Sequence, residues 1–194
     1  MFILITGGSK SGKSAVAEKI AVSSGLPLYY IATMMPYGDD AHEAIERHRK
    51  MRSGKGFETV EKYTDVSEIT FPDKPAVLLE CIGNLCANEM FSANCKNTSE
   101  KIFRDIELLN RKTGLLIAVT SQVGEDGIVY DSGTMDYIAE LGKLNARLAG
   151  LADCVIETVY GIPLILKGER NLIVCNKFAV FSVSDVLKNS HAQN

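Results

Sequence analysis

The 194-residue sequence has no excess of positive charge and no long apolar run. Its 21 Lys and Arg residues are outnumbered by 24 Asp and Glu residues, which gives a net charge of -3, whereas proteins that grip nucleic acid usually carry a basic excess. No apolar segment approaches the roughly 18 residues that a membrane-spanning helix needs. The first residues show no charged leader followed by a cleavable apolar stretch. We therefore expect a soluble cytoplasmic protein that acts neither on nucleic acid nor in a membrane.

Cysteine and histidine are too few and too scattered to suggest a structural metal or a disulfide framework. The five cysteines are odd in number and include no C-x-x-C pair, whereas structural zinc sites use closely spaced pairs. Cys154 and Cys175 lie in apolar runs, where a reduced thiol behaves as a small hydrophobic side chain. Hydrophobic residues make up 46% of the chain, and a domain of this length can bury a sufficient core without such links.

Short apolar runs alternate with helical patterns along most of the chain. The runs are nearly continuous in Val, Ile and Leu, which is typical of strands buried on both faces of a parallel sheet. The expected strands are Phe2–Thr6, Leu28–Ala32, Ala76–Cys81, Leu115–Thr120, Cys154–Val159, Pro163–Lys167, Leu172–Cys175 and Phe178–Val183. The expected helices are Lys13–Ser23, Asp39–Arg52, Ser99–Lys112 and Gly133–Leu151. The pattern predicts one α/β domain over residues 1–188, a three-layer sandwich with a mostly parallel central sheet, and a loose tail at 189–194.

A phosphate-binding motif follows the first expected strand. Residues 7–14 read G-G-S-K-S-G-K-S and match G-x-x-x-x-G-K-[ST] in full, between a strand and a helix. The glycines allow successive backbone N–H groups to surround an anion at the helix N-terminus. Lys13 is expected to contact the β- and γ-phosphates, and the Ser14 hydroxyl to ligate Mg²⁺. The candidate nucleotide-binding residues are Gly7, Gly8, Ser9, Lys10, Ser11, Gly12, Lys13 and Ser14. The motif predicts a P-loop NTPase-like fold, the alternative being a Gly/Ser turn with an exposed lysine.

Glu80 ends the apolar run A-V-L-L-E, which is the arrangement of a Walker B element. Acidic residues also end strands for solubility alone. With a phosphate loop upstream, we expect Glu80 to be the second Mg²⁺ ligand, together with Ser14.

His48 lies on the apolar side of the expected 39–52 helix. At about 100° per residue, one face collects Ala41, Ala44, Ile45, His48, Met51 and Arg52, while Glu43, Glu46, Arg47 and Lys50 take the other. Two interpretations stay open. His48 is either a core histidine beside a snorkelling arginine, or a neutral imidazole that attacks phosphorus while the arginines offset nucleotide charge.

Several motifs occur in a fixed order along the chain. After the phosphate loop come Y-I-A-T at Tyr30–Thr33, H-R-x-x-R at His48–Arg52, T-V-E at Thr59–Glu61, L-L-E-C at Leu78–Cys81, V-G…G-I-V at Val123–Val129, L-N-A-R-L-A…A-D at Leu144–Asp153 and G-I-P-L at Gly161–Leu164. This series resembles the bifunctional adenosylcobinamide kinase / adenosylcobinamide-phosphate guanylyltransferase family of cobalamin biosynthesis, and the likeness extends to about Lys167.

The resemblance implies two reactions on one corrinoid substrate. A nucleoside triphosphate, ATP or GTP, phosphorylates the hydroxyl on the aminopropanol arm of adenosylcobinamide, and GTP then transfers GMP onto that phosphate. The guanylyl group passes through a histidine in this family, and His48 falls on that position. Beyond the phosphate loop, the family's nucleotide contacts fall on Ala32, Thr33, Met34, Arg49, Lys50, Met51, Arg52, Glu61 and Glu80. The resemblance also implies a homotrimer.

Some segments depart from the family pattern. Ser53 and Phe57 stand where the family usually has proline and tryptophan, and Ser121-Gln122 replaces Asn-Glu. Tyr130 stands where proline is common. These segments could contact the corrinoid or the base, whereas the phosphate loop is intact.

Two other functions remain open from the residues alone. A plain small-molecule kinase with a structural His48 would phosphorylate an alcohol without becoming loaded with nucleotide. A nucleotide-sensing module would show slow hydrolysis and ligand-dependent partner binding.

Overall fold

A computed structural model describes residues 1–124 and 126–168, with all of their side chains except those at 39–41, 44 and 51. Within these residues, seven strands form one sheet in the order β3-β2-β4-β5-β1-β6-β7. Their bounds are β1 Phe2–Thr6, β2 Leu28–Ala32, β3 Phe57–Glu61, β4 Ala76–Glu80, β5 Leu115–Val119, β6 Cys154–Val159 and β7 Ile162–Lys167. Every neighbouring pair is parallel except β6 with β7. The predicted mostly parallel sheet is confirmed.

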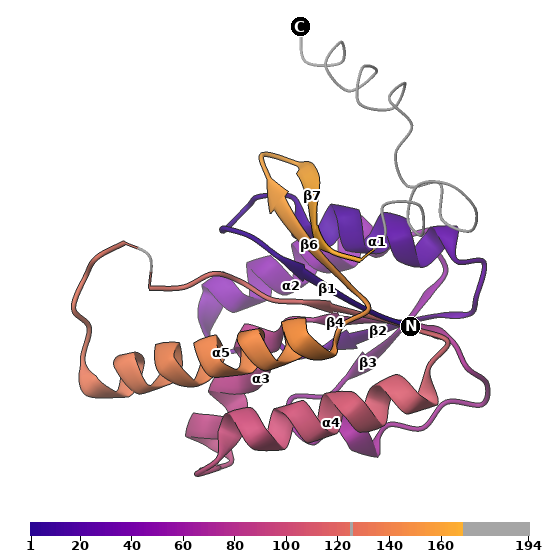
Figure 1. The fold of residues 1–194 in the computed structure, drawn as a ribbon. Coiled ribbons are helices and arrows are strands. Elements are labelled where there is room, and N and C mark those ends of the chain that lie inside the picture. Colours follow the sequence, from indigo (N-terminus) through magenta and orange to yellow (C-terminus); the bar gives the residue numbers. More distant parts are fainter. Residues whose placement is uncertain (125, 169–194) are drawn as a thin grey trace, which may run out of the picture.

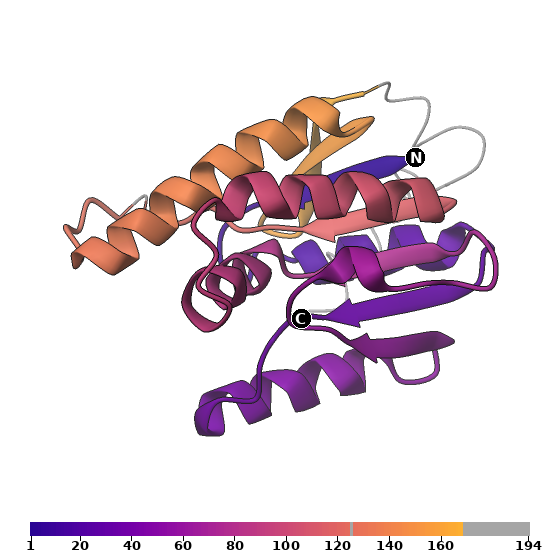
Figure 2. The same cartoon turned by 90° about the horizontal axis from the view of Figure 1, so that it is seen from below.

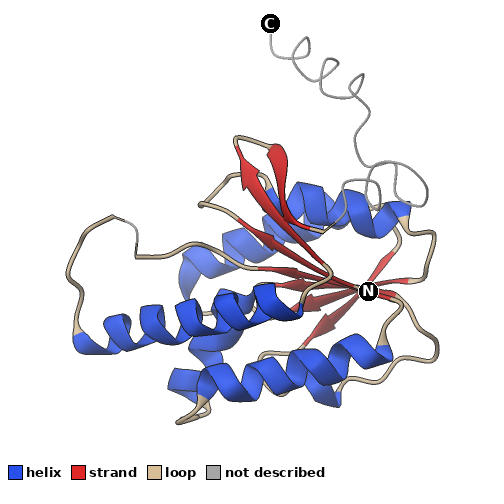
Figure 3. Cartoon of the chain, in the orientation of Figure 1, coloured by secondary structure: helices blue, strands red, loops and turns tan. Residues whose placement is uncertain are grey.

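Helices cover both faces of this sheet, as Figures 1 and 3 show. They are α1 Lys13–Ser23, α2 Gly38–Arg52, α3 Ile82–Ala87, α4 Thr98–Lys112 and α5 Ser132–Leu151, with a 3-10 turn at Val66–Glu68 and a π-helix at Asn88–Ser92. Seen from below in Figure 2, α4 and α5 lie side by side across one face. The fold is a three-layer, P-loop NTPase-like sandwich. None of the described helices is both long and apolar enough to cross a bilayer.

The core has two halves because alternate residues of the central strands point to opposite faces of the sheet. In β1, Ile3 and Ile5 pack with α1, whereas Phe2 and Leu4 pack with α3, α4 and α5. The central strands therefore have no polar face. Because their apolar runs are continuous, the sequence predicts the ends of these strands to within about one residue.

Two segments fold in ways that the sequence pattern did not predict. β3 is an edge strand with exposed side chains at three of its five positions, so it lacks the apolar run of a buried strand. The α3 and π-helical segment, residues 82–92, is too short and too interrupted by Gly and Asn to show a helical period. The strands expected at Leu172–Cys175 and Phe178–Val183 and the tail at 189–194 lie outside the described residues. The domain's extent to residue 188 therefore stays a prediction.

The sheet order brings the carboxyl ends of several strands to one edge. β1 lies between β5 and β6, and β4 and β2 continue the sheet beyond β5. Loops that follow parallel strands meet at this edge, where doubly wound sheets bind their ligands. The residues after β1, β2, β4 and β5 therefore form the candidate site.

Candidate active site

The loop after β1 has a backbone shape that glycine favours. Gly7 and Gly12 have φ values of 140° and 96°, and a Cβ on Gly7 would lie 2.5 Å from the carbonyl oxygen of Thr158. The hydroxyls of Ser11 and Thr158 are 2.8 Å apart, and the N–H of Gly161 donates to the Ser11 carbonyl at 2.9 Å. The β6–β7 turn thus holds the phosphate loop in position at the start of α1.

Lys13 lies folded over this loop. Its Nζ donates to the carbonyl oxygens of Gly7 at 2.9 Å and Gly8 at 2.6 Å. Desolvation lowers the pKa of Lys13, while the nearby Glu80 carboxylate opposes the shift. Phosphate oxygens entering the loop would give the ammonium stronger acceptors than two carbonyls.

The Glu80 carboxylate joins three elements at the end of β4. Ser14, on α1, donates its hydroxyl to Glu80 Oε1, and Tyr30, on β2, donates to Oε2 at 3.2 Å. His48, on α2, places Nδ1 3.7 Å from Oε1. Burial, with the nearby Glu80 charge, raises the pKa of Tyr30, so its phenol stays protonated as a donor. One carboxylate therefore links the phosphate loop to the histidine helix.

The inner face of α2 carries polar atoms without partners. His48 has a side chain that is 20% exposed, and its buried Nδ1 makes no hydrogen bond. Arg52 is 7% exposed, and its guanidinium carbon lies 3.4 Å from the Tyr30 ring centroid, while Nε and Nη1 are buried and unpaired. The prediction that His48 and Arg52 face the protein body is confirmed. Buried unpaired donors are costly, so this face is suited to an anionic ligand.

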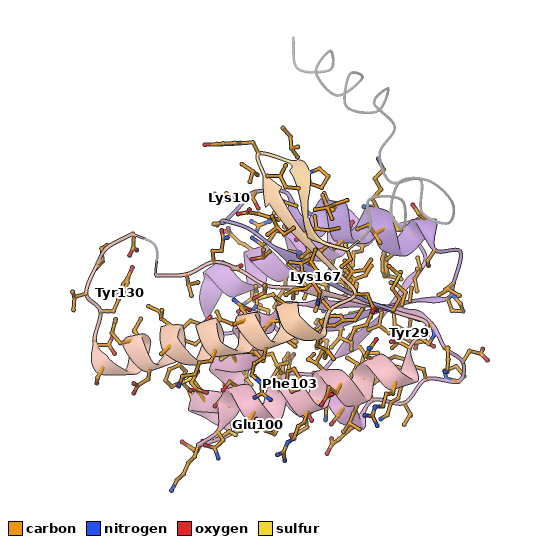
Figure 4. All side chains as sticks on the ribbon, in the orientation of Figure 1. Lys10, Tyr29, Glu100, Phe103, Tyr130 and Lys167 are labelled. Carbon is orange, nitrogen blue, oxygen red and sulfur yellow. The ribbon has the colours of Figure 1, made fainter. Side chains whose placement is uncertain are left out.

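These groups line one cleft with a volume of about 690 Å³, a size suited to a small ligand. Its predicted site residues are Ser9, Lys10, Ser11, Gly12, Lys13, Ser14, Ala32, Met34, His48, Arg52 and Glu80. Figure 4 shows Lys10 on the phosphate loop. The structure thus brings together the loop, the strand-end acid and the histidine.

Gly7, Gly8 and Thr33 do not line the cleft, although they lie next to residues that do. The two glycines accept hydrogen bonds from Lys13. Thr33 is fully buried, and its Oγ1 accepts from the N–H of Cys81 at 2.7 Å and donates to the Cys81 carbonyl at 2.9 Å. Within the described structure Thr33 therefore supports the β4 end.

Arg49, Lys50 and Glu61 do not line the cleft. Arg49 forms an exposed ion pair with Glu61 at 3.0 Å, and a second with Glu46 at 3.4 Å. Lys50 is exposed. The side chain of Met51 is outside the described residues. Nucleotide contacts at these positions stay predictions.

The cleft also has walls that were not predicted as site residues. These are Ala15, Tyr30, Ile45, Arg47, Cys81, Asn84, Val119, Ser121, Gln122 and Val123. The helical wheel predicts that Arg47 lies on the outer face of its helix, yet its side chain lines the cleft. Tyr30 was missed because its partner Glu80 is far away in the sequence. Ser121 and Gln122 belong to a segment that the departures from the family pattern marked as a possible corrinoid or base contact. Their place directly after a buried parallel strand also indicates the site, and the same holds for Val123.

An ion pair with one buried partner joins the turn after α2 to α1. Lys55 Nζ lies 2.5 Å from Glu18 Oε2, and the Glu18 side chain is 2% exposed. We expect Lys55→Met to lower the free energy of unfolding by about 2 kcal/mol, because the buried carboxylate loses its partner. Lys62→Met is the matched control: Lys62 pairs with Glu68 at 2.6 Å, but Glu68 is 67% exposed, so we expect a loss of about 0.5 kcal/mol. Urea unfolding measures both, and equal losses would contradict this assignment.

A second acidic cluster lies away from the cleft. Asp65, Glu89 and Asp105 converge in a geometry that could hold a metal ion. Lys101 Nζ lies 2.8, 2.5 and 3.1 Å from them. Desolvation opposes protonation of Lys101, but hydrogen bonds to the three carboxylates raise its pKa. The lysine ammonium is therefore the cation of this cluster.

Comparison with solved structures supports the fold. A structure from Pyrococcus horikoshii, described as a structural study, superposes with a TM-score of 0.54 at 9% sequence identity, covering 89% of this chain and 88% of that one. At this identity the likeness concerns the fold alone.

Comparison of sequences identifies the family. This chain is 33% identical to the bifunctional adenosylcobalamin biosynthesis protein CobU of Escherichia coli and 30% identical to CobU of Salmonella typhimurium. Both alignments cover 86% of this chain and 100% of the relative. The bifunctional adenosylcobalamin biosynthesis protein CobP of Pseudomonas aeruginosa is 28% identical to this chain, and the alignment covers 86% of this chain and 97% of CobP. Residues 3–166 match the model described as cobinamide kinase / cobinamide phosphate guanyltransferase. The chain therefore belongs to this family of bifunctional kinases and guanylyltransferases of cobalamin biosynthesis, as the order of its motifs predicts.

Proposed function

We propose that the single cleft carries out both reactions and that His48 carries the guanylyl group between them. The first reaction phosphorylates the aminopropanol hydroxyl of adenosylcobinamide, and the second transfers GMP from GTP to that phosphate. The observation that carries the proposal is the position of the His48 imidazole, which faces the Glu80 carboxylate in the cleft that also contains Lys13.

The phosphate loop positions the triphosphate in both reactions. Backbone N–H groups of residues 7–14 surround the β- and γ-phosphates, and Lys13 exchanges its two loop carbonyls for phosphate oxygens. Ser14 and Glu80 present a hydroxyl and a carboxylate to each other, and such hard oxygen donors fit Mg²⁺. Bound there, Mg²⁺ would neutralise charge on the phosphate oxygens.

Glu80 also faces the histidine. His48 Nδ1 lies 3.7 Å from Glu80 Oε1 without a hydrogen bond between them, and a proton on this nitrogen, on the side of the carboxylate, leaves the lone pair on Nε2. Nε2 attacks the α-phosphorus of GTP, so that a P–N bond forms while the P–O bond to pyrophosphate breaks. A phosphate oxygen of adenosylcobinamide phosphate then attacks the same phosphorus, and the P–N bond breaks to release adenosylcobinamide-GDP. Arg52, with unpaired donors, offsets charge that develops on the transferred phosphoryl oxygens.

Labelling tests the intermediate. The protein is incubated with Mg²⁺ and GTP that carries a radioactive α-phosphorus, then digested and mapped. We expect one labelled peptide, the one that contains His48, with a label that is stable in alkali and released by acid. His42→Ala is the control, because His42 lies on the same helix but is exposed and bonds to the Gly38 carbonyl. A label that persists in His48→Ala, or no label at all as for a plain kinase, would contradict the proposal.

We further propose that the enzyme works as a homotrimer in the cytoplasm. The trimer rests on the family resemblance, and the exposed apolar side chains Ile162, Leu164 and Leu166 along β7 are compatible with an interface between subunits. Light scattering should give the mass of three 21.1 kDa chains, and cell fractionation should recover the activity in the cytoplasmic fraction. A monomer, or activity in the membrane fraction, would contradict this part.

A further inference from the structure

The long connection between β5 and α5 carries apolar side chains that the rest of the described structure leaves uncovered. Ile128 is 59% exposed, Val129 89% and Tyr130 36%, and Val123 is 37% exposed at the cleft wall. Figure 4 shows Tyr130 on this loop, which extends beyond the sheet. Contiguous exposed apolar side chains mark interaction or ligand-binding surfaces, unlike single scattered ones.

This apolar strip, Val123 with Ile128–Tyr130, starts at the wall of the cleft. Ser121, Gln122 and Val123 line the cleft, and Ile128–Tyr130 follow later in the same connection between β5 and α5. A ligand that leaves the cleft past Val123 leaves it beside the connection that carries the strip.

The acceptor must extend out of the cleft because of its size. A cleft of about 690 Å³ suits a ligand of nucleotide size, and an adenosylated corrinoid is far larger than a nucleoside triphosphate. Only the aminopropanol arm needs to reach the reacting phosphorus. The corrin ring therefore needs a surface at the mouth of the cleft.

The strip has the chemistry that a corrin ring requires. The ring has broad apolar faces, and its cobalt centre carries positive charge. The loop offers branched and aromatic side chains together with the carboxylates of Asp126 and Asp131. Hydrogen bonds from Tyr130 and from the Ile128 N–H lower the pKa of Asp126, and hydrogen bonds from Thr134 lower that of Asp131, so both are ionised at neutral pH.

Local hydrogen bonds hold the strip in shape. The Tyr130 hydroxyl donates to Asp126 Oδ2 at 2.6 Å, and the Ile128 N–H donates to Oδ1 at 3.2 Å. At the start of α5, the Thr134 N–H donates to Asp131 at 3.0 Å. A surface that is ordered before binding loses less conformational freedom when the ligand arrives.

We infer that this strip binds one face of the corrin ring of adenosylcobinamide and of its phosphate, while the aminopropanol arm enters the cleft. The inference rests on the proposed function, since it places the substrate of those two reactions.

The test replaces the two most exposed apolar side chains together, Ile128→Ser with Val129→Ser. We expect the KM for adenosylcobinamide and for its phosphate to rise about tenfold, because each buried apolar side chain contributes to binding. Loading of His48 with GMP from GTP alone should not change, since it involves no corrinoid. Leu108→Ser is the matched control, an apolar residue of α4 that is 47% exposed, and it should leave both values unchanged.

Three outcomes are decisive. An unchanged KM, with equilibrium binding of adenosylcobinamide followed by its visible absorbance also unchanged, would overturn the inference. A changed KM together with a changed oligomeric mass would overturn it too, because the strip would then contact a second copy of the chain. If the wild-type protein takes up no GMP, the proposed function fails, and the equilibrium binding measurement still decides whether the strip holds the corrinoid.

Discussion

Replacing His48 with Ala is expected to lower the rate of guanylyl transfer by at least about 10⁴-fold, as removal of a covalent nucleophile does in other enzymes. Phosphorylation of adenosylcobinamide should persist, because the phosphate loop and Ser14 keep their positions. The two activities are measured separately, as adenosylcobinamide phosphate formed from ATP and adenosylcobinamide-GDP formed from GTP.

Two further variants make this result interpretable. His48→Asn keeps a polar side chain opposite Glu80, so it should lose guanylyl transfer as His48→Ala does. If only the Ala variant fails, the histidine acts by holding Glu80 in place. His42→Ala, on the exposed side of the same helix, should retain both activities. Equal loss of both activities in His48→Ala would show that the residue serves the fold or the nucleotide site.

Replacing Lys13 with Met should lower kcat/KM for both reactions by about 10³-fold, the scale observed when a charge-stabilising group is removed from an active site. Lys13 is the partly buried cation of the phosphate loop, and both reactions need a triphosphate bound there. Methionine keeps most of the side-chain length and removes the charge. Steady-state kinetics with ATP and with GTP measure the effect.

Lys96→Met is the control for the loss of one positive charge, because Lys96 is exposed in the loop before α4 and should have little effect. A Lys13→Met protein that loses phosphorylation but keeps guanylyl transfer would indicate two separate nucleotide sites and would contradict the single cleft.

The fold is predictable wherever the chain is buried on both faces of the sheet. The runs at Phe2–Thr6 and Cys154–Val159 coincide with β1 and β6, because complete burial leaves an unbroken apolar signal. β3 escapes prediction because it lies at the edge with exposed side chains. The degree of burial thus explains both why β1 and β6 were predicted and why β3 was not.

The site is predictable where its chemistry is local in sequence. The phosphate loop occupies eight consecutive residues, and the direction of His48 follows from one helical wheel. The contacts of Glu80 with Tyr30 and His48 join three elements across the fold, and no pattern within one segment encodes them. The same holds for Arg52, whose guanidinium stacks on Tyr30 from the neighbouring strand.

A single-turnover chase tests the central claim most directly. The protein is first loaded with GMP from GTP and Mg²⁺, freed of unbound nucleotide, and then mixed with adenosylcobinamide phosphate. We predict that the bound GMP leaves His48 as one equivalent of adenosylcobinamide-GDP forms, at a rate no slower than steady-state turnover. Bound GMP that stays on the protein, while product forms only after fresh GTP is added, would contradict the account.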